Sequence, residues 1–142
     1  MDCKQCGCSI KKYAFKYCSN QCQRNFEYGV FVTDWKSGVV TGSVGLTAKN
    51  ISGYLKRYLD EKYGFKCSLC GWDKVNSVTN RVPLEIDHIN GDSEDNSEIN
   101  LRVVCPNCHS LSSNYKNLNR GKGRVWRKDK YIKNPRTGAR GE

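Results

Sequence analysis

Four cysteines of this 142-residue chain have the spacing of metal ligands. They form two Cys-x2-Cys pairs with 34 residues between them, and the pairs are Cys67 with Cys70 and Cys105 with Cys108. Two such pairs supply the four thiolates of a tetrahedral, structural Zn²⁺ site, which leaves no open position for catalysis. The alternative is four buried free thiols. We expect zinc, which would clamp whatever lies between the two pairs.

A second cysteine group lies at the N-terminus. The pattern Cys3-x2-Cys6-x11-Cys18-x3-Cys22 fits a second structural zinc site in a small four-cysteine finger over residues 1–26. Cys8 is the odd one out, either free or a replacement for Cys6. Two roles stay open for this finger, DNA targeting and structural capping.

Polar residues suited to hydrolysis lie between and beside the second group of cysteines. Asp87 and His88 are neighbours on an expected strand, so their side chains point to opposite sides, and one can bind a metal while the other reaches a water. His109 directly follows Cys108. A carboxylate suits a hard cation such as Mg²⁺, and histidine, with an ordinary pKa of about 6.5, suits proton abstraction at neutral pH. Hydrolysis of a phosphodiester requires both.

The run LEIDHINGD, followed by NLRVVCPNCHSL, resembles the HNH endonucleases, which have the ββα-metal nuclease fold. The match is best to the zinc-framed subgroup, and residues 51–124 are similar to phage-encoded HNH endonucleases of the homing type. The resemblance implies that Asp87 and His109 ligate one divalent ion, that His88 is the general base, and that Asn100 orients this base. Mg²⁺ is the expected ion, with Mn²⁺ and Ni²⁺ as alternatives. Ser113 stands where some relatives carry a further histidine.

Each of these residues also has an ordinary structural interpretation. His88 could be a half-buried structural histidine, and His109 could be a neighbour of the zinc site or a substitute for one cysteine. Asp87 could form a salt bridge, and Asn100 could cap a turn. Because both histidines of the chain fall in the motif, catalysis is favoured. Glu85 shares a strand face with Asp87. It could be a surface charge or a partner of a metal ligand.

The elements that must position these residues follow from hydrophobic periodicity. An apolar stripe predicts a helix that ends at Gly64. Alternation of apolar and polar residues predicts one strand, and a run of branched residues predicts a second strand. Pro106 opens a final helix. A hairpin is expected in residues 31–41, with Phe31–Thr33 and Val39–Thr41 as its arms. The expected ranges are helix Ile51–Tyr63, strands Leu84–Ile89 and Leu101–Val104, and helix Pro106–Leu118.

The expected fold class is therefore a small, zinc-stabilised α+β protein. A chain with only 37% hydrophobic residues has little apolar surface to bury, so metal staples are expected. The expected domains are the finger at 1–26, a connector with the hairpin at 27–50, an HNH nuclease domain at 51–119 and a basic tail at 120–142.

The charge of the chain points to a polyanionic partner. Lys and Arg number 24 against 14 Asp and Glu, a net charge of +10, and ten of the basic residues lie in residues 116–142. Nucleic acid is the first candidate and a membrane surface the second. The basic segment either follows phosphates or is a solvated tail. The candidate DNA contacts are Lys116, Arg120, Lys122, Arg124, Arg127 and Lys128.

These patterns predict a metal-dependent DNA endonuclease with two structural zinc ions. One site would nick one strand, and we expect a monomer or weak dimer with no small-molecule substrate. The sequence after Met1 lacks a signal peptide and no apolar run of 18 residues occurs, so the expected location is the cytoplasm. The alternatives are a non-catalytic zinc-finger DNA-binding protein and an RNA-directed or recombination-related nuclease.

Overall fold

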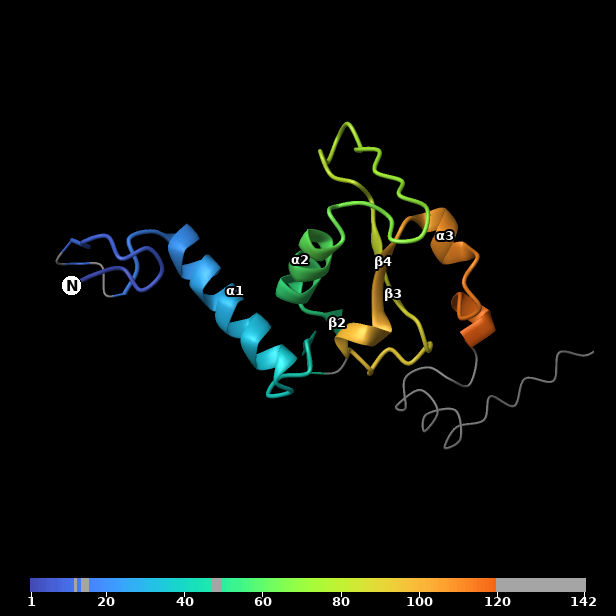
Figure 1. Cartoon of the computed structure of the whole chain (residues 1–142), viewed down its shortest axis with the longest axis horizontal. Coiled ribbons are helices and arrows are strands. Elements are labelled where there is room, and N and C mark those ends of the chain that lie inside the picture. Colours follow the sequence, from blue (N-terminus) through green and yellow to red (C-terminus); the bar gives the residue numbers. More distant parts are fainter. Residues whose placement is uncertain (12, 14–15, 47–49, 120–142) are drawn as a thin grey trace, which may run out of the picture. The chain divides into compact units, whose positions relative to one another are not determined.

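The computed structural model describes residues 1–11, 13, 16–46 and 50–119 (Figure 1). The chain divides into two compact units, an N-terminal unit (Met1–Tyr58) and a C-terminal unit (Leu59–Glu142). The expected basic tail, with five of the six candidate DNA contacts, lies outside the described residues. No helix in the described part of the chain is long and apolar enough to cross a membrane.

Helix α1 (Asn20–Lys36) dominates the N-terminal unit. Its N-cap is Ser19, whose hydroxyl accepts a hydrogen bond from the backbone N–H of Cys22 at 3.2 Å. The hairpin expected over residues 31–41 is wrong, because Phe31–Thr33 belong to this helix. Phe31 and Trp35 lie one helical turn apart and stack on two tyrosines of α2, and this packing favours the helix over a strand.

A short antiparallel pair follows α1, formed by β1 (Ser43–Val44) and β2 (Asn50–Ile51). Gly42 precedes it with φ +76°, and a Cβ at this position would lie 2.7 Å from Leu55 Cδ2. The next element is α2 (Gly53–Lys62), which confirms the helix expected over Ile51–Tyr63 within two residues at its start. The boundary between the two units falls within this helix.

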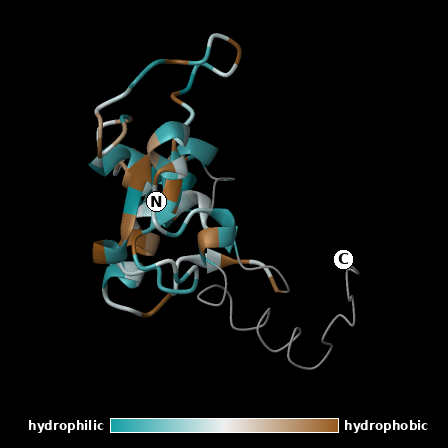
Figure 2. Cartoon of the chain, turned by 90° about the vertical axis from the view of Figure 1, so that its right-hand side faces the viewer, coloured by the Kyte–Doolittle hydropathy of each residue, from teal (hydrophilic) through white to brown (hydrophobic). Residues whose placement is uncertain are grey.

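The C-terminal unit is built on two antiparallel strands, β3 (Glu85–His88) and β4 (Leu101–Val104) (Figure 1). Both expected strands are confirmed, β3 within one residue at each end of Leu84–Ile89 and β4 at the expected Leu101–Val104. Their register puts Asp87 opposite Arg102, and residues of β4 are buried in the core. In Figure 2, hydrophobic segments (brown) alternate with hydrophilic ones (teal) along the helices and strands, as expected for elements with one buried face.

Helix α3 (Pro106–Ser110) is shorter than the expected helix to Leu118. Leu111 and Leu118, two of the apolar residues that predicted its length, are 84% and 66% exposed, so no buried surface supports further turns. Instead the chain bends into a 3₁₀ turn, η2 (Lys116–Asn119). Asn114 and Asn119 then donate hydrogen bonds to the carbonyls of Ile89 and Gly91, at 2.9 and 2.7 Å.

The turn after β3 depends on Gly91. Its φ is +76°, and a Cβ there would lie 2.8 Å from Asn114 Cγ and even closer to the side-chain oxygen of Asn119. The left-handed backbone alone costs a non-glycine residue about 1–2 kcal/mol. The closeness of both asparagines adds steric strain to that cost.

We therefore expect Gly91→Ala to destabilise the C-terminal unit by at least about 1 kcal/mol more than Gly64→Ala. Gly64 is the matched control, because it has φ +67° and its only close neighbour is the end of the Lys66 side chain at 3.9 Å. Urea unfolding of the metal-loaded protein measures both free energies of unfolding. Equal losses of unfolding free energy in the two variants would contradict the close packing of Asn114 and Asn119 against Gly91.

Candidate metal centre and active site

The four thiols of Cys67, Cys70, Cys105 and Cys108 come together in the C-terminal unit. Their sulfur atoms all lie within 4.8 Å of one another, and Cys70 Sγ is 3.8 Å from Cys105 Sγ. Zn–S bonds of about 2.3 Å in a tetrahedron place two sulfurs about 3.8 Å apart, so this donor set fits Zn²⁺. The expected quartet of ligands is therefore assembled in one place.

Local backbone structure builds this cluster. Gly71 adopts φ +76° and donates its N–H to the carbonyl of Cys67 at 2.9 Å, which closes the turn of the first pair. Cys105 is the N-cap of α3, and its sulfur accepts the N–H of Cys108 at 3.4 Å. Burial raises the pKa of Cys67, but backbone hydrogen bonds from Cys105, Cys70 and Leu69 outweigh burial and lower that pKa to about 6. Cys67 thus favours the thiolate, the form that binds a metal, whereas hydrogen bonds with Cys70 and Cys105 raise the pKa of Cys108 to about 12.

The N-terminal cluster differs from the expected ligand set. The sulfur atoms of Cys3, Cys6, Cys8 and Cys18 lie within 4.8 Å of one another, so Cys8 is part of the group. The expected fourth ligand, Cys22, has its Sγ 3.4 Å from that of Cys18. Cys8 is brought in because its carbonyl accepts the N–H of Cys3 at 2.8 Å, across a turn in which Gly7 has φ +71°. Five thiols therefore surround a site for four ligands.

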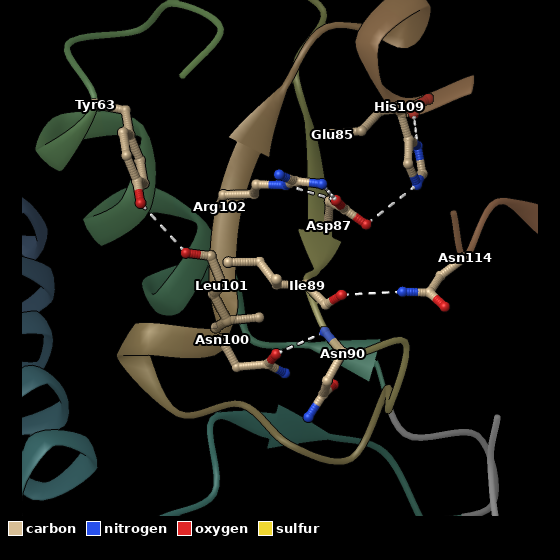
Figure 3. Close-up of polar contacts among 10 residues, drawn as sticks. All are labelled: Tyr63, Glu85, Asp87, Ile89, Asn90, Asn100, Leu101, Arg102, His109 and Asn114. Carbon is tan, nitrogen blue, oxygen red and sulfur yellow. Dashed lines mark hydrogen bonds and ion pairs between the residues drawn. The ribbon is translucent and has the colours of Figure 1, made fainter. Parts of the chain in front are cut away.

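Asp87 is buried in β3 and divides its two carboxylate oxygens between different partners (Figure 3). Arg102, opposite it on β4, places both Nε and Nη2 at 2.7 Å from Oδ2. Oδ1 faces Nε2 of His109 at 3.8 Å. The salt bridge that sequence reasoning weighed as an alternative is present, but it occupies only one of the two oxygens.

His109 lies in the first turns of α3 and is oriented from two sides. A carboxylate oxygen of Glu85 forms a hydrogen bond with its Nδ1 (Figure 3). Tyr115 packs edge-on against its ring with centroids 5.2 Å apart. A carboxylate at Nδ1 favours the proton there, which leaves the Nε2 lone pair directed at Asp87. Two neighbouring ligand atoms at about 2.1 Å from one octahedral ion lie about 3.0 Å apart. Asp87 Oδ1 and His109 Nε2 are 3.8 Å apart, so a small approach of the two side chains would let them share one divalent cation.

His88 has a different environment from its neighbour Asp87, as strand alternation predicts. Its Nε2 lies 2.8 Å from Oδ1 of Asn96, a side chain in the loop between β3 and β4 with 5% exposure. Among the described residues, no hydrogen bond is made to its Nδ1.

Asn100 spans the loop between the two strands. Its Oδ1 accepts the N–H of Asn90 at 2.9 Å (Figure 3), and its Nδ2 donates to the carbonyl of Asp95 at 2.8 Å. Its side chain makes no hydrogen bond to the ring of His88, the base that the resemblance implies Asn100 orients.

Three functional candidates were missed or set aside by sequence reasoning: Glu85, Asn96 and Arg102. Glu85 had a signal, since it alternates with Asp87 on one strand. Arg102 could be found only from the strand register, and Asn96 only from the path of the loop. Of the candidate DNA contacts, Lys116 alone is described, and its Nζ lies 4.9 Å from the centre of the Tyr115 ring.

Comparison with known proteins finds a relative whose activity class is named. The chain is 35% identical over 57 residues to a protein named H-N-H endonuclease F-TflIV from Escherichia phage T5. This relative confirms the resemblance to HNH endonucleases. The match covers 40% of this chain and 24% of that endonuclease. No family model matches the chain, and no solved structure matches it.

The two thiol clusters agree with the zinc-framed group of HNH endonucleases, because each can supply four sulfur ligands. In the C-terminal unit the cluster also holds the segment that carries His109. Loss of one thiol should therefore disturb both the metal content and the fold of that unit.

We expect Cys105→Ser to lower the zinc content by one ion per chain and to unfold the C-terminal unit, because zinc binding supplies folding free energy. Zinc content by metal analysis and thermal unfolding by circular dichroism are the two measurements. Ser110→Ala is the control, since Ser110 is exposed in the same helix and is not a thiol ligand. A Cys105→Ser variant that melts at the same temperature as the wild type would exclude a stabilising zinc ion at this cluster.

Proposed function

We propose that this chain is a metal-dependent HNH endonuclease with a ββα-metal core, which hydrolyses phosphodiester bonds of DNA. The observation that carries the proposal is the opposition of Asp87 Oδ1 and His109 Nε2 at 3.8 Å, beside a cluster of four cysteines. An Asp–His pair can hold one divalent ion and a second histidine next to the aspartate can act as a base, which together could hydrolyse a phosphodiester. The relative from phage T5 supports the same class of activity.

Asp87 and His109 would hold the divalent ion, for which Mg²⁺ is the proposed identity, with Mn²⁺ and Ni²⁺ as alternatives. The bound cation would supply Lewis acidity at the scissile phosphate. Arg102 holds the other oxygen of Asp87, so the carboxylate keeps one orientation toward His109. Glu85 does the same for the imidazole of His109.

His88 is the proposed general base. Its hydrogen bond to Asn96 at Nε2 leaves Nδ1 to take a proton from the attacking water. The product would be one broken strand per site, so a monomer should nick duplex DNA, and a double-strand break would require a second site. We propose a homing-type nickase acting in the cytoplasm as a monomer or weak dimer.

The distribution of charge suggests how DNA is held. Residues 59–119 contain six Lys and Arg against nine Asp and Glu, a net charge of −3, whereas residues 1–26 contain five against one. Residues 59–119, which carry the proposed active site, therefore repel DNA at long range. We propose that Lys116 in η2 and the basic candidates beyond residue 119 supply phosphate contacts.

One observation favours a second candidate function, a non-catalytic zinc-finger DNA-binding protein. Arg102 pairs with the buried carboxylate of Asp87, and on this alternative the pair serves the fold alone, because removing one partner would leave an uncompensated buried charge. This alternative leaves the side-chain hydrogen bonds of His109 and His88 without a purpose. Metal binding and cleavage distinguish the two functions.

Replacing Glu85 tests the metal site. We expect Glu85→Gln to weaken Mn²⁺ binding by about 10- to 100-fold, because the carboxylate that orients His109 is lost. Isothermal titration of the zinc-loaded protein gives the affinity. Glu94→Gln removes the same charge from an exposed residue of the same unit and should leave the affinity within about twofold. If the two substitutions weakened Mn²⁺ binding equally, the effect of Glu85 would come from its charge alone and not from its contact with His109.

Replacing His88 tests the reaction. With Mg²⁺ or Mn²⁺ we expect the wild type to convert supercoiled plasmid to nicked circles, and EDTA to stop it. His88→Ala should lower the rate by at least about 100-fold while a gel shift shows unchanged DNA binding. Loss of binding as well would assign His88 to the fold. A wild type that shifts DNA but leaves plasmid intact with every metal and on a mixed-sequence library would favour the DNA-binding alternative.

A further inference from the structure

Asn96 is a buried polar residue that contacts the proposed general base. It is 5% exposed, and its Oδ1 lies 2.8 Å from His88 Nε2. An amide oxygen can only accept a hydrogen bond, so Nε2 must carry the proton of the neutral ring. The lone pair of the imidazole is then at Nδ1, the nitrogen that makes no hydrogen bond among the described residues.

The loop that carries Asn96 is held by a set of hydrogen bonds. The N–H of Asn96 donates to the carbonyl of Glu94 at 3.2 Å. Asp95, the residue before Asn96, accepts hydrogen bonds from the hydroxyl and the N–H of Ser97, the residue after it, and from the side-chain amide of Asn90. Hydrogen bonds from Ser97 lower the pKa of Asp95, so this carboxylate remains a charged acceptor. The position of Asn96 is therefore set by its neighbours on both sides.

The two histidines of the site are held in opposite tautomers. Glu85 occupies Nδ1 of His109 and leaves Nε2 free for a ligand role, whereas Asn96 occupies Nε2 of His88 and leaves Nδ1 free for a proton. The acceptors also differ in charge, a carboxylate for the proposed metal ligand and a neutral amide for the proposed base. Such a pairing gives two identical side chains two different functions.

We infer that Asn96 is the positioning residue of the general base, and that it fixes both the orientation and the tautomer of His88. The inference rests on the proposed nuclease function and moves the task of orienting the ring from Asn100 to Asn96. Asn100 then acts one step away, because its Nδ2 holds the carbonyl of Asp95, the residue before Asn96.

Two substitutions separate hydrogen bonding from packing. Asn96→Leu keeps a side chain of similar size but removes the acceptor, and Asn96→Asp keeps an acceptor at the same place. Asn107→Leu is the control, because Asn107 is exposed in α3 of the same unit. Zinc content and thermal unfolding identify any variant that fails to fold.

The first readout is the tautomer itself, measured by the ¹⁵N chemical shifts of the imidazole nitrogens in the Mg²⁺-free, zinc-loaded protein. The chain has only two histidines, so the signals are assigned with one His88→Gln variant. We expect the Nε2–H form in the wild type, in Asn96→Asp and in Asn107→Leu. Asn96→Leu should show a mixture of both tautomers.

The second readout is plasmid nicking with Mg²⁺. Asn96→Leu should lower kcat by about 10- to 100-fold with KM within about twofold, because only the base is misplaced. Asn96→Asp should restore most of kcat. An Asn96→Leu protein that folds and keeps the Nε2–H form and full kcat would overturn the inference, as would an Asn96→Asp protein with the Nδ1–H form. A wild type that cleaves neither plasmid nor the mixed-sequence library with any metal would refute the nuclease function and the role of His88 as its base. The tautomer measurement would still decide separately whether Asn96 fixes the His88 ring.

Discussion

The packing of α3 against the β3–β4 pair is the constraint on which the proposed active site depends. This helix has only five residues and no buried residue of its own, so little apolar surface holds it in place. Its N-cap is Cys105, which belongs to the same thiol cluster as Cys67 and Cys70. Zinc bound at this cluster would fix the start of α3, and His109 follows within one turn. Zinc ligation would thus substitute for a core in placing a side chain opposite Asp87.

Given that placement, the remaining geometry follows from strand alternation and from the choice of hydrogen-bond acceptors. Asp87 and Glu85 share one face of β3, so one carboxylate meets His109 at Nε2 and the other at Nδ1. Arg102 balances part of this negative charge and leaves one oxygen of Asp87 to a cation. His88 points the other way and meets a neutral amide. One strand of four residues therefore separates the proposed metal ligand from the proposed base.

Sequence reasoning located the strands and the residues with reactive groups, because alternation and cysteine spacing are local signals. It failed where long-range packing decides. Phe31–Thr33 have strand-forming residues but lie in α1, because Phe31 and Trp35 pack on α2. The spacing of Leu111 and Leu118 predicted a longer helix, but both leucines are exposed and no packing supports it. Asn96 lies in a polar loop with no periodicity, and only the fold shows that it reaches His88. Which four of the five N-terminal cysteines lie closest together likewise depends on the turn at Gly7, not on their spacing in the sequence.

The charge pattern is a further consequence of the site. A cation site requires carboxylates, and with its loop acids the C-terminal unit carries nine acidic residues over residues 59–119. Those same groups oppose a polyanion, so residues 59–119 by themselves repel DNA until a divalent ion binds. On the proposed function, basic segments outside residues 59–119 would hold the DNA. The five basic residues of the first 26 and the nine beyond residue 119 lie on both sides of this segment in the sequence. The proposed function would thus assign catalysis and affinity to different parts of the chain, which would let the site keep its carboxylates.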